Sequence, residues 1–149
     1  MKTIMAERSG VVVAVSGGFD PIHIGHVRLF QEAKKLGDTL VVILNGDSWL
    51  KRKKGAYFMN QEDRAEIIDA LACVDETFIW ESEDDHVSGA LEVVRPHIFA
   101  NGGDRKNIED IPEAAVCDRL GINMVFNIGK GGKIRSSSDL LQAYDGKYN

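Results

Sequence analysis

Two histidines three residues apart follow a pair of glycines near the start of the chain. They are His23 and His26 in the segment Gly17-Gly18-Phe19-Asp20-Pro21-Ile22-His23-Ile24-Gly25-His26. The glycines let the backbone approach a ligand closely, and side chains three apart at the start of a helix can point to one spot. The amino end of a helix also favours phosphate. We therefore expect phosphate binding and charge stabilisation in phosphoryl transfer here. The alternatives are two histidines that cap a helix, or that bind a metal.

A basic run lies beyond the second expected strand. Residues 45–60 are polar and basic with no regular period, so we expect an irregular segment that contains Lys51-Arg52-Lys53-Lys54. A run of this kind is usually a solvated face, but its place beside a strand end favours phosphate binding. Asp47 and Trp49 could contact a second substrate, or they could stabilise a turn and anchor the loop.

Later polar segments also follow expected strands. Asn101-Gly102-Gly103-Asp104 could border a ligand or form an ordinary glycine turn. A glycine-rich basic loop over residues 129–135 precedes Ser136-Ser137-Ser138, which opens the last expected helix. Hydroxyl and N–H groups at a helix start can hold phosphate, and a helix cap alone explains one serine but hardly three.

Strands and helices are expected to alternate along the chain. Apolar runs predict strands at about residues 10–16, 39–44, 77–80, 97–100 and 122–126. Helical patterns fall at about residues 25–36, 60–72, 87–94 and 112–120, with Gly37 and Gly121 as helix ends and Asn60 as a cap. This order predicts an α/β domain with a parallel sheet. Ligands of such sheets bind beyond the carboxyl ends of the strands, where all the polar segments above are placed.

The composition fits a protein of the cytoplasm. The chain has 149 residues, 44% of them hydrophobic, and a net charge of −5, which argues against wholesale nucleic-acid binding. We find no apolar run of the length that a membrane span needs and no secretory signal. The two cysteines, Cys73 and Cys117, are expected to be buried thiols, since no Cys/His spacing resembles a zinc site.

The segment from Gly18 to His26 resembles the HxGH signature of the nucleotidylyltransferase superfamily. Its members include glycerol-3-phosphate cytidylyltransferase and heptose-phosphate adenylyltransferase domains. Likeness to the cytidylyltransferase-like branch continues at residues 32–42 and 64–76 and, more weakly, at 102–104 and 136–138. The resemblance implies a single Rossmann-like domain over residues 1–149 with its core at about 10–142. Its five-stranded parallel sheet would have the order 3-2-1-4-5 and be flanked by helices.

The resemblance also implies roles for individual residues. Catalytic roles fall on His23, His26, Lys53, Lys54 and Arg64. From their place after the second expected strand, Asp47 and Trp49 are expected to contact the acceptor together with Lys51, with the alternatives given above. Nucleotide contacts fall on Gly17, Gly18, Phe19, Asp20, Gly25, Asn101, Gly102, Gly103, Asp104, Lys133, Arg135, Ser136, Ser137 and Ser138.

The implied activity is transfer of a nucleoside monophosphate from an NTP to a small phosphorylated acceptor, with release of pyrophosphate. Mg²⁺ would be carried mainly by the NTP phosphates, without a metal site on the protein. Where the cytidylyltransferase branch has Arg-Thr-Glu-Gly-Ile, this chain has residues 131–135, Gly-Gly-Lys-Ile-Arg, so both CTP and ATP remain open. A homodimer also remains open, because family members are often dimers or larger.

Two other functions are weighed against this activity. One is a catalytically weak nucleotide-binding or regulatory protein of the same fold. The other is a dinucleotide-binding oxidoreductase, which the chain does not favour because it lacks Gly-x-Gly-x-x-Gly after the first strand.

Overall fold

The computed structural model describes residues 10–102, 111–129 and 141–142. Within them five strands form one sheet in the order β3-β2-β1-β4-β5, and every neighbouring pair is parallel. The prediction of a Rossmann-like α/β fold with strand order 3-2-1-4-5 is confirmed. The strands are β1 (Val12–Gly17), β2 (Thr39–Asn45), β3 (Glu76–Trp80), β4 (Ile98–Ala100) and β5 (Asn123–Val125).

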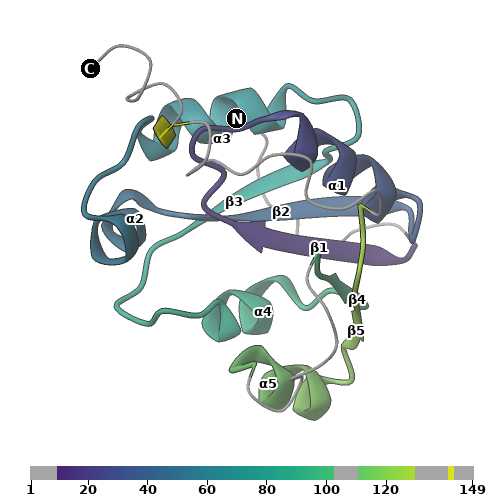
Figure 1. Cartoon of the computed structure of the whole chain (residues 1–149). Helices are drawn as coiled ribbons and strands as arrows, with labels where there is room; N and C mark the ends of the chain where they lie inside the picture. The colour runs from purple at the N-terminus through teal and green to yellow at the C-terminus, as the bar shows by residue number, and fades with distance from the viewer. Residues whose placement is uncertain (1–9, 103–110, 130–140, 143–149) are drawn as a thin grey trace.

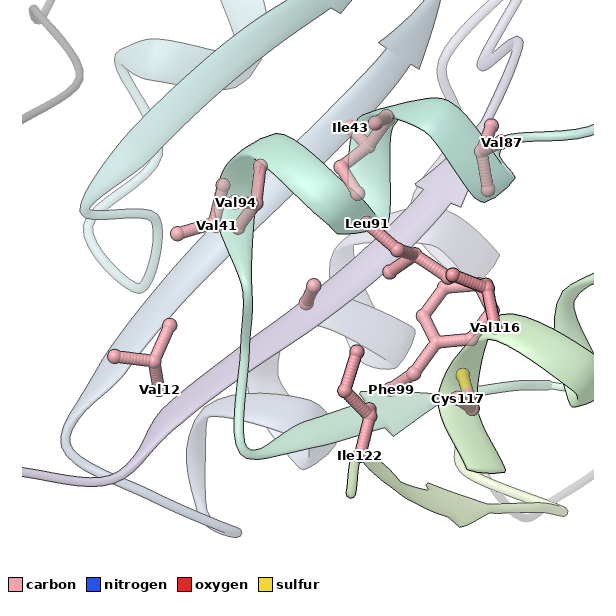
Figure 2. Close-up of a cluster of buried hydrophobic side chains, with 12 residues drawn as sticks. Val12, Val41, Ile43, Val87, Leu91, Val94, Phe99, Val116, Cys117 and Ile122 are labelled. Carbon is pink, nitrogen blue, oxygen red and sulfur yellow. The ribbon is translucent and has the colours of Figure 1, made fainter. Parts of the chain in front are cut away.

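Helices cover both faces of this sheet (Figure 1). α1 (Ile24–Lys34) and α3 (Gln61–Asp69) lie on one face, and α4 (Ser88–Val94) and α5 (Glu113–Leu120) lie on the other. Alternate residues of β1 therefore face different cores, Val13 toward α1 and α3 and Val12 toward α4 and α5. Figure 2 shows the second of these cores. Burial on both faces explains why the central strands β1 and β2 contain continuous apolar runs.

The order of the strands along the chain reverses between β1 and β4, although all strands run parallel. The chain continues from β1 to β2 and β3 on one side, and later returns to β4 and β5 on the other. The loops after β1 and β4 therefore leave the sheet side by side, at the position where α/β sheets bind ligands. The glycine–histidine segment directly follows β1, and Asn101 directly follows β4.

The expectation of an irregular segment after β2 was wrong. Within residues 45–60, where we expected an irregular segment, the structure has a helix, α2 (Asp47–Lys54). Asp47 in its first turn and the basic residues in its last turn complement the helix dipole, and Gly55 ends it in the left-handed conformation at φ 84°. Leu50 is the buried residue of this helix. The sequence therefore has no apolar stripe from which the helix could be predicted.

Two of the three residues expected at helix ends, Asn60 and Gly121, are found there, and Gly37 is not. The Asn60 side chain accepts a hydrogen bond from the Asp63 N–H at 2.8 Å, and Gly121 closes α5 at φ 71°, as expected. Gly37 does not end α1, which is capped by Lys35. A Cβ at Gly37 would lie 2.6 Å from the carbonyl oxygen of Val11. Glycine is required there because the chain passes close to the beginning of β1.

Both cysteines are free thiols. Neither cysteine forms a disulfide; Cys117 is buried and Cys73 only partly so. Burial raises the pKa of Cys117 to about 11, with a smaller contribution from the charge of Glu113. In the part of the chain that the structure describes, no helix is long and apolar enough to cross a bilayer.

Candidate functional site

The histidine pair opens α1 and caps it. The His23 Nδ1 accepts a hydrogen bond from the Gly25 N–H at 3.1 Å, and the His26 Nδ1 accepts one from the His23 N–H at 3.2 Å. The two rings stack with their centroids 3.7 Å apart. Because Nδ1 is the acceptor in both capping bonds, each neutral ring carries its hydrogen on Nε2. Capping, one of our alternatives, is therefore present, and it makes Nε2 the donor atom of each ring.

Phe19 supports the ring of His26 from below the helix start. Its side chain is buried and packs edge to face against two rings. The Phe19 ring centroid lies 4.9 Å from that of His26 and 5.0 Å from that of Phe30. Its backbone is left-handed at φ 49°. A Cβ at Gly17 would lie 2.8 Å from the Phe19 ring, so glycine at this position leaves room for the Phe19 side chain.

The second glycine of the loop lies against α2. A Cβ at Gly18 would lie 3.0 Å from Cδ2 of Leu50 and 3.1 Å from the ring of Trp49. The side chain of Trp49 also donates a hydrogen bond from Nε1 to the carbonyl oxygen of Asp85 at 3.2 Å. Trp49, predicted to contact an acceptor, thus anchors α2 beside the glycine loop.

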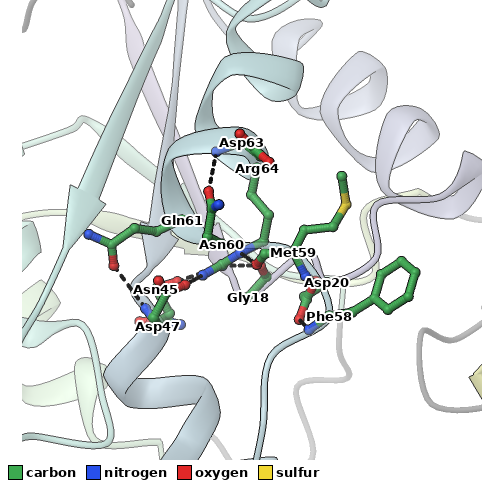
Figure 3. A network of polar contacts seen from close by, with 10 residues as sticks. All are labelled: Gly18, Asp20, Asn45, Asp47, Phe58, Met59, Asn60, Gln61, Asp63 and Arg64. Carbon is green, nitrogen blue, oxygen red and sulfur yellow. Dashed lines mark hydrogen bonds and ion pairs between the residues drawn. The ribbon is translucent and has the colours of Figure 1, made fainter.

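Asp20 connects the glycine–histidine segment to the loop after α2. Its buried carboxylate accepts hydrogen bonds from the Phe58 N–H at 2.6 Å and from the Met59 N–H at 2.7 Å (Figure 3). Both carboxylate oxygens are engaged in this way. The contacts give Asp20 a positioning role, since they hold the chain between the basic run and α3 against the loop that follows β1.

Arg64 lies at the centre of the same network (Figure 3). Its side chain is fully buried, and Nε donates to the Met59 carbonyl at 2.9 Å. Nη1 donates to the carbonyls of Gly18 at 2.7 Å and Asn45 at 2.8 Å, and Nη2 donates to the Asp47 carboxylate at 2.8 Å. Each of these partners is a protein atom. Arg64 therefore joins the ends of β1 and β2 to α2, and its catalytic role stays a prediction.

The four residues of the basic run make different contacts. The Lys51 Nζ lies 5.3 Å from the centroid of the Tyr57 ring. Arg52 and Lys53 reach the acidic connection after β3, where each lies 3.6 Å from a carboxylate oxygen of Asp85. Lys54 is exposed at the end of α2. All four are on α2, which the packing on Gly18 places beside the glycine loop.

The end of β4 contributes the other side of the site. The Asn101 N–H donates to the Val125 carbonyl at 2.7 Å, and the Asn101 carbonyl accepts from the Ile128 N–H at 3.1 Å. Gly102 follows and is exposed. Seven further predicted residues fall outside the described ranges: Gly103, Asp104, Lys133, Arg135, Ser136, Ser137 and Ser138.

Two positioning residues were missed in the sequence. The Gln61 Oε1 accepts a hydrogen bond from the Asp47 N–H at 2.9 Å, and Asp85 pairs with the basic run. Gln61 gives no local signal, because its partner lies 14 residues earlier in the sequence. Asp85 could have been found by matching the acidic residues 81–85 to the basic residues 51–54.

Comparison with known proteins agrees with this geometry. A profile described as cytidylyltransferase-like matches residues 14–116, which include the carboxyl end of β1, the histidine pair, α2, Asp20 and Arg64. The chain belongs to the cytidylyltransferase-like family. The match covers every described element that builds the carboxyl edge around β1 and β2.

Individual relatives of this cytidylyltransferase-like chain are longer proteins. It is 40% identical over 134 residues to the bifunctional protein HldE of Streptomyces coelicolor, covering 89% of this chain and 28% of that protein. It is 36% identical over 111 residues to HldE of Aliarcobacter butzleri, covering 73% of this chain and 23% of the relative. The chain thus spans about a quarter of the length of these relatives.

Solved structures show the same fold. A lipopolysaccharide core biosynthesis protein from Thermoplasma volcanium superposes with a TM-score of 0.65 at 30% identity, covering 78% of this chain and 93% of that one. A protein of unknown function from Archaeoglobus fulgidus has a TM-score of 0.61 at 19% identity, with 85% and 96% coverage, and shares the fold.

Proposed function

We propose that this cytidylyltransferase-like chain transfers a nucleoside monophosphate from CTP or ATP to a small phosphorylated acceptor. The observation that carries the proposal is the His23–His26 pair, which caps α1 directly after the glycine loop of β1 and presents Nε2 as the donor atom of both rings. Donors fixed before the reaction are what a phosphoryl-transfer transition state needs.

The reaction proposed is an in-line displacement. A phosphate oxygen of the acceptor forms a bond to the α-phosphorus of the NTP, and the bond from that phosphorus to the bridging oxygen of the β-phosphate breaks. Pyrophosphate leaves with the electron pair of the broken bond. The histidine Nε2 hydrogens and lysines of α2 stabilise the charge that develops on these oxygens. No general base is needed, because a phosphate acceptor is already ionised.

Mg²⁺ belongs to the proposal as a companion of the NTP. Among the described residues no three His, Cys, Asp or Glu side chains are grouped so that they could hold a metal ion, and the oxygens of Asp20 are engaged with backbone N–H groups. A cation bound through the substrate phosphates fits this set, because Mg²⁺ often uses few protein carboxylates. Its chemistry there would be neutralisation of phosphate charge.

The histidine variants that test the proposal follow from the capping geometry. An alanine at either position would remove a helix cap as well as the donor, and a lost cap costs about 1 kcal/mol. Asparagine places its Oδ1 where Nδ1 accepts the capping bond but has no group at Nε2. Glutamine places an N–H near Nε2 but leaves the Nδ1 position empty. The pair His26→Asn and His26→Gln therefore separates donation to phosphate from capping.

The experiment is a pyrophosphate-release screen of four NTPs against sugar, polyol and cofactor phosphates. We expect activity with CTP or ATP, and a drop of about 100-fold or more in kcat for His26→Asn with its unfolding free energy nearly unchanged. His26→Gln should be less stable but retain more activity than His26→Asn. If the wild type binds NTP without releasing pyrophosphate across the panel, the chain is instead a nucleotide-binding or regulatory protein.

A further inference from the structure

We propose that Asp85 is a built-in competitor for the NTP phosphates at Lys53, and so sets the affinity of the site for nucleotide. This inference rests on the proposed function, because it concerns the lysines of α2 that would hold the triphosphate. Asp85 lies in the acidic connection between β3 and α4 and controls how readily Lys53 binds the NTP phosphates.

The acidic connection is docked on α2 through its backbone. The Arg52 Nη2 donates to the carbonyls of Ser82 at 2.7 Å and Asp84 at 3.3 Å, and the Trp49 Nε1 donates to the carbonyl of Asp85 at 3.2 Å. These bonds do not involve the Asp85 carboxylate. The backbone of residue 85 is therefore held beside α2 whatever its side chain is.

The docked backbone presents the Asp85 carboxylate to two cations. Its Oδ1 lies 3.6 Å from Nε of Arg52, and its Oδ2 lies 3.6 Å from Nζ of Lys53. Arg52 is already committed to two backbone carbonyls. Lys53 has this carboxylate as its described ion partner, and both side chains are partly open to solvent, at 44% for Lys53 and 60% for Asp85. An anion that arrives from solvent can therefore exchange with the carboxylate.

Lys53 lies one helical turn beyond the residues that touch the glycine loop. Trp49 and Leu50 are the α2 residues against Gly18, and a turn of helix advances about 5.4 Å. The long lysine side chain can span such a distance from the phosphate-binding loop. A triphosphate bound there carries more negative charge than one carboxylate and would displace Asp85 from Lys53.

A pair of matched variants tests this competition. Asp85→Asn and Glu83→Gln each remove one negative charge from the same exposed segment, but Glu83 makes no ion pair within the described residues. Titration calorimetry of the full chain would use inorganic tripolyphosphate, ATP and CTP as ligands. We expect binding about two- to fivefold tighter for Asp85→Asn, the range that an exposed ion pair supports, and little change for Glu83→Gln. The gain should shrink in 0.5 M salt because exposed charges are then screened.

A double-variant cycle connects the effect to Lys53. In a Lys53→Met background the Asp85→Asn gain should largely disappear, because the partner of the competitor is gone. An equal gain in both backgrounds, an equal gain for Glu83→Gln, or no gain for Asp85→Asn in a wild type that binds nucleotide would overturn this inference alone. A wild type that binds none of the three ligands would overturn the proposed function and this inference together.

Discussion

The Arg64 guanidinium donates a hydrogen bond to the backbone carbonyl of Gly18 at 2.7 Å and so joins the first turn of α3 to the glycine loop after β1. These residues are 46 positions apart in the sequence. The same side chain donates to Asn45 at the end of β2 and to Asp47 at the start of α2. One buried cation therefore sets the relative positions of the three segments that make up this side of the site.

Arg64→Lys should destabilise the fold strongly. Lysine lacks the planar fork that serves four acceptors at once, so buried carbonyls and the Asp47 carboxylate would lose their donors. We expect the unfolding free energy to fall by about 2 kcal/mol or more, measured by urea denaturation. Arg28→Lys, on the exposed face of α1, is the control and should change it by less than about 0.5 kcal/mol. Equal losses for the two variants would contradict the role assigned to Arg64.

Asp20→Asn should loosen the loop after α2. An amide has one acceptor oxygen, so one of the N–H groups of Phe58 and Met59 would lose its partner and face an NH₂ group. We expect a loss of about 1–3 kcal/mol and faster hydrogen exchange of these two amides, measured by NMR. Asp63→Asn, an exposed change in the first turn of α3, should leave both exchange rates as they are. Unchanged exchange in Asp20→Asn would show that the hydrogen bonds to the Asp20 carboxylate are not needed to hold this loop.

Gly17→Ala should disturb the packing of Phe19 against His26. The added methyl would lie 2.8 Å from the Phe19 ring, which packs on His26 and Phe30. Overpacking of this kind costs about 1–3 kcal/mol, and thermal unfolding would measure the loss. In the matched change Gly102→Ala, the added Cβ would lie no closer than 3.7 Å to a heavy atom of the described residues, and we expect the variant to be neutral or slightly stabilising. The prediction fails if the two alanine variants melt alike.

Cys117 should resist alkylation. Burial raises its pKa from 9.0 to about 11, so at pH 8 its thiolate fraction is about 100-fold lower than that of an ordinary thiol. Iodoacetamide labelling of Cys73→Ser, which retains only Cys117, should be at least that much slower in native protein than in urea. Mass spectrometry would follow the label, and comparable rates in the two conditions would contradict a buried, protonated thiol.

The same pKa predicts a change of stability with pH. A pKa that is raised in the folded state means that the unfolded chain loses the thiol proton first. The contribution of Cys117 to stability is then complete below pH 9 and is lost as the pH rises through about 11. Urea denaturation between pH 8 and pH 11 should show this decline, and Cys117→Ala should remove that part of it.

The order of elements and the histidine segment could be predicted from the sequence because their signals are local. A buried parallel strand is a continuous apolar run wherever it lies, as in Val12 to Val15, and Asn60 caps its own helix three residues away. The spacing of His23 and His26 likewise placed both at one helix start. Strand order followed from the likeness to a family, and the structure confirmed it.

The partners of the site residues were decided by the tertiary structure. The resemblance gave Arg64 a catalytic role, whereas the structure surrounds its buried side chain with backbone carbonyls from the loop after β1, the end of β2 and the loop before α3. The basic run read as one irregular phosphate-binding segment, yet it forms a helix in which Arg52 docks a loop and Lys53 faces Asp85. These contacts join residues that are 5 to 46 positions apart. A polar side chain buried by distant segments takes its partners from them, and no periodicity in its own segment records which they are.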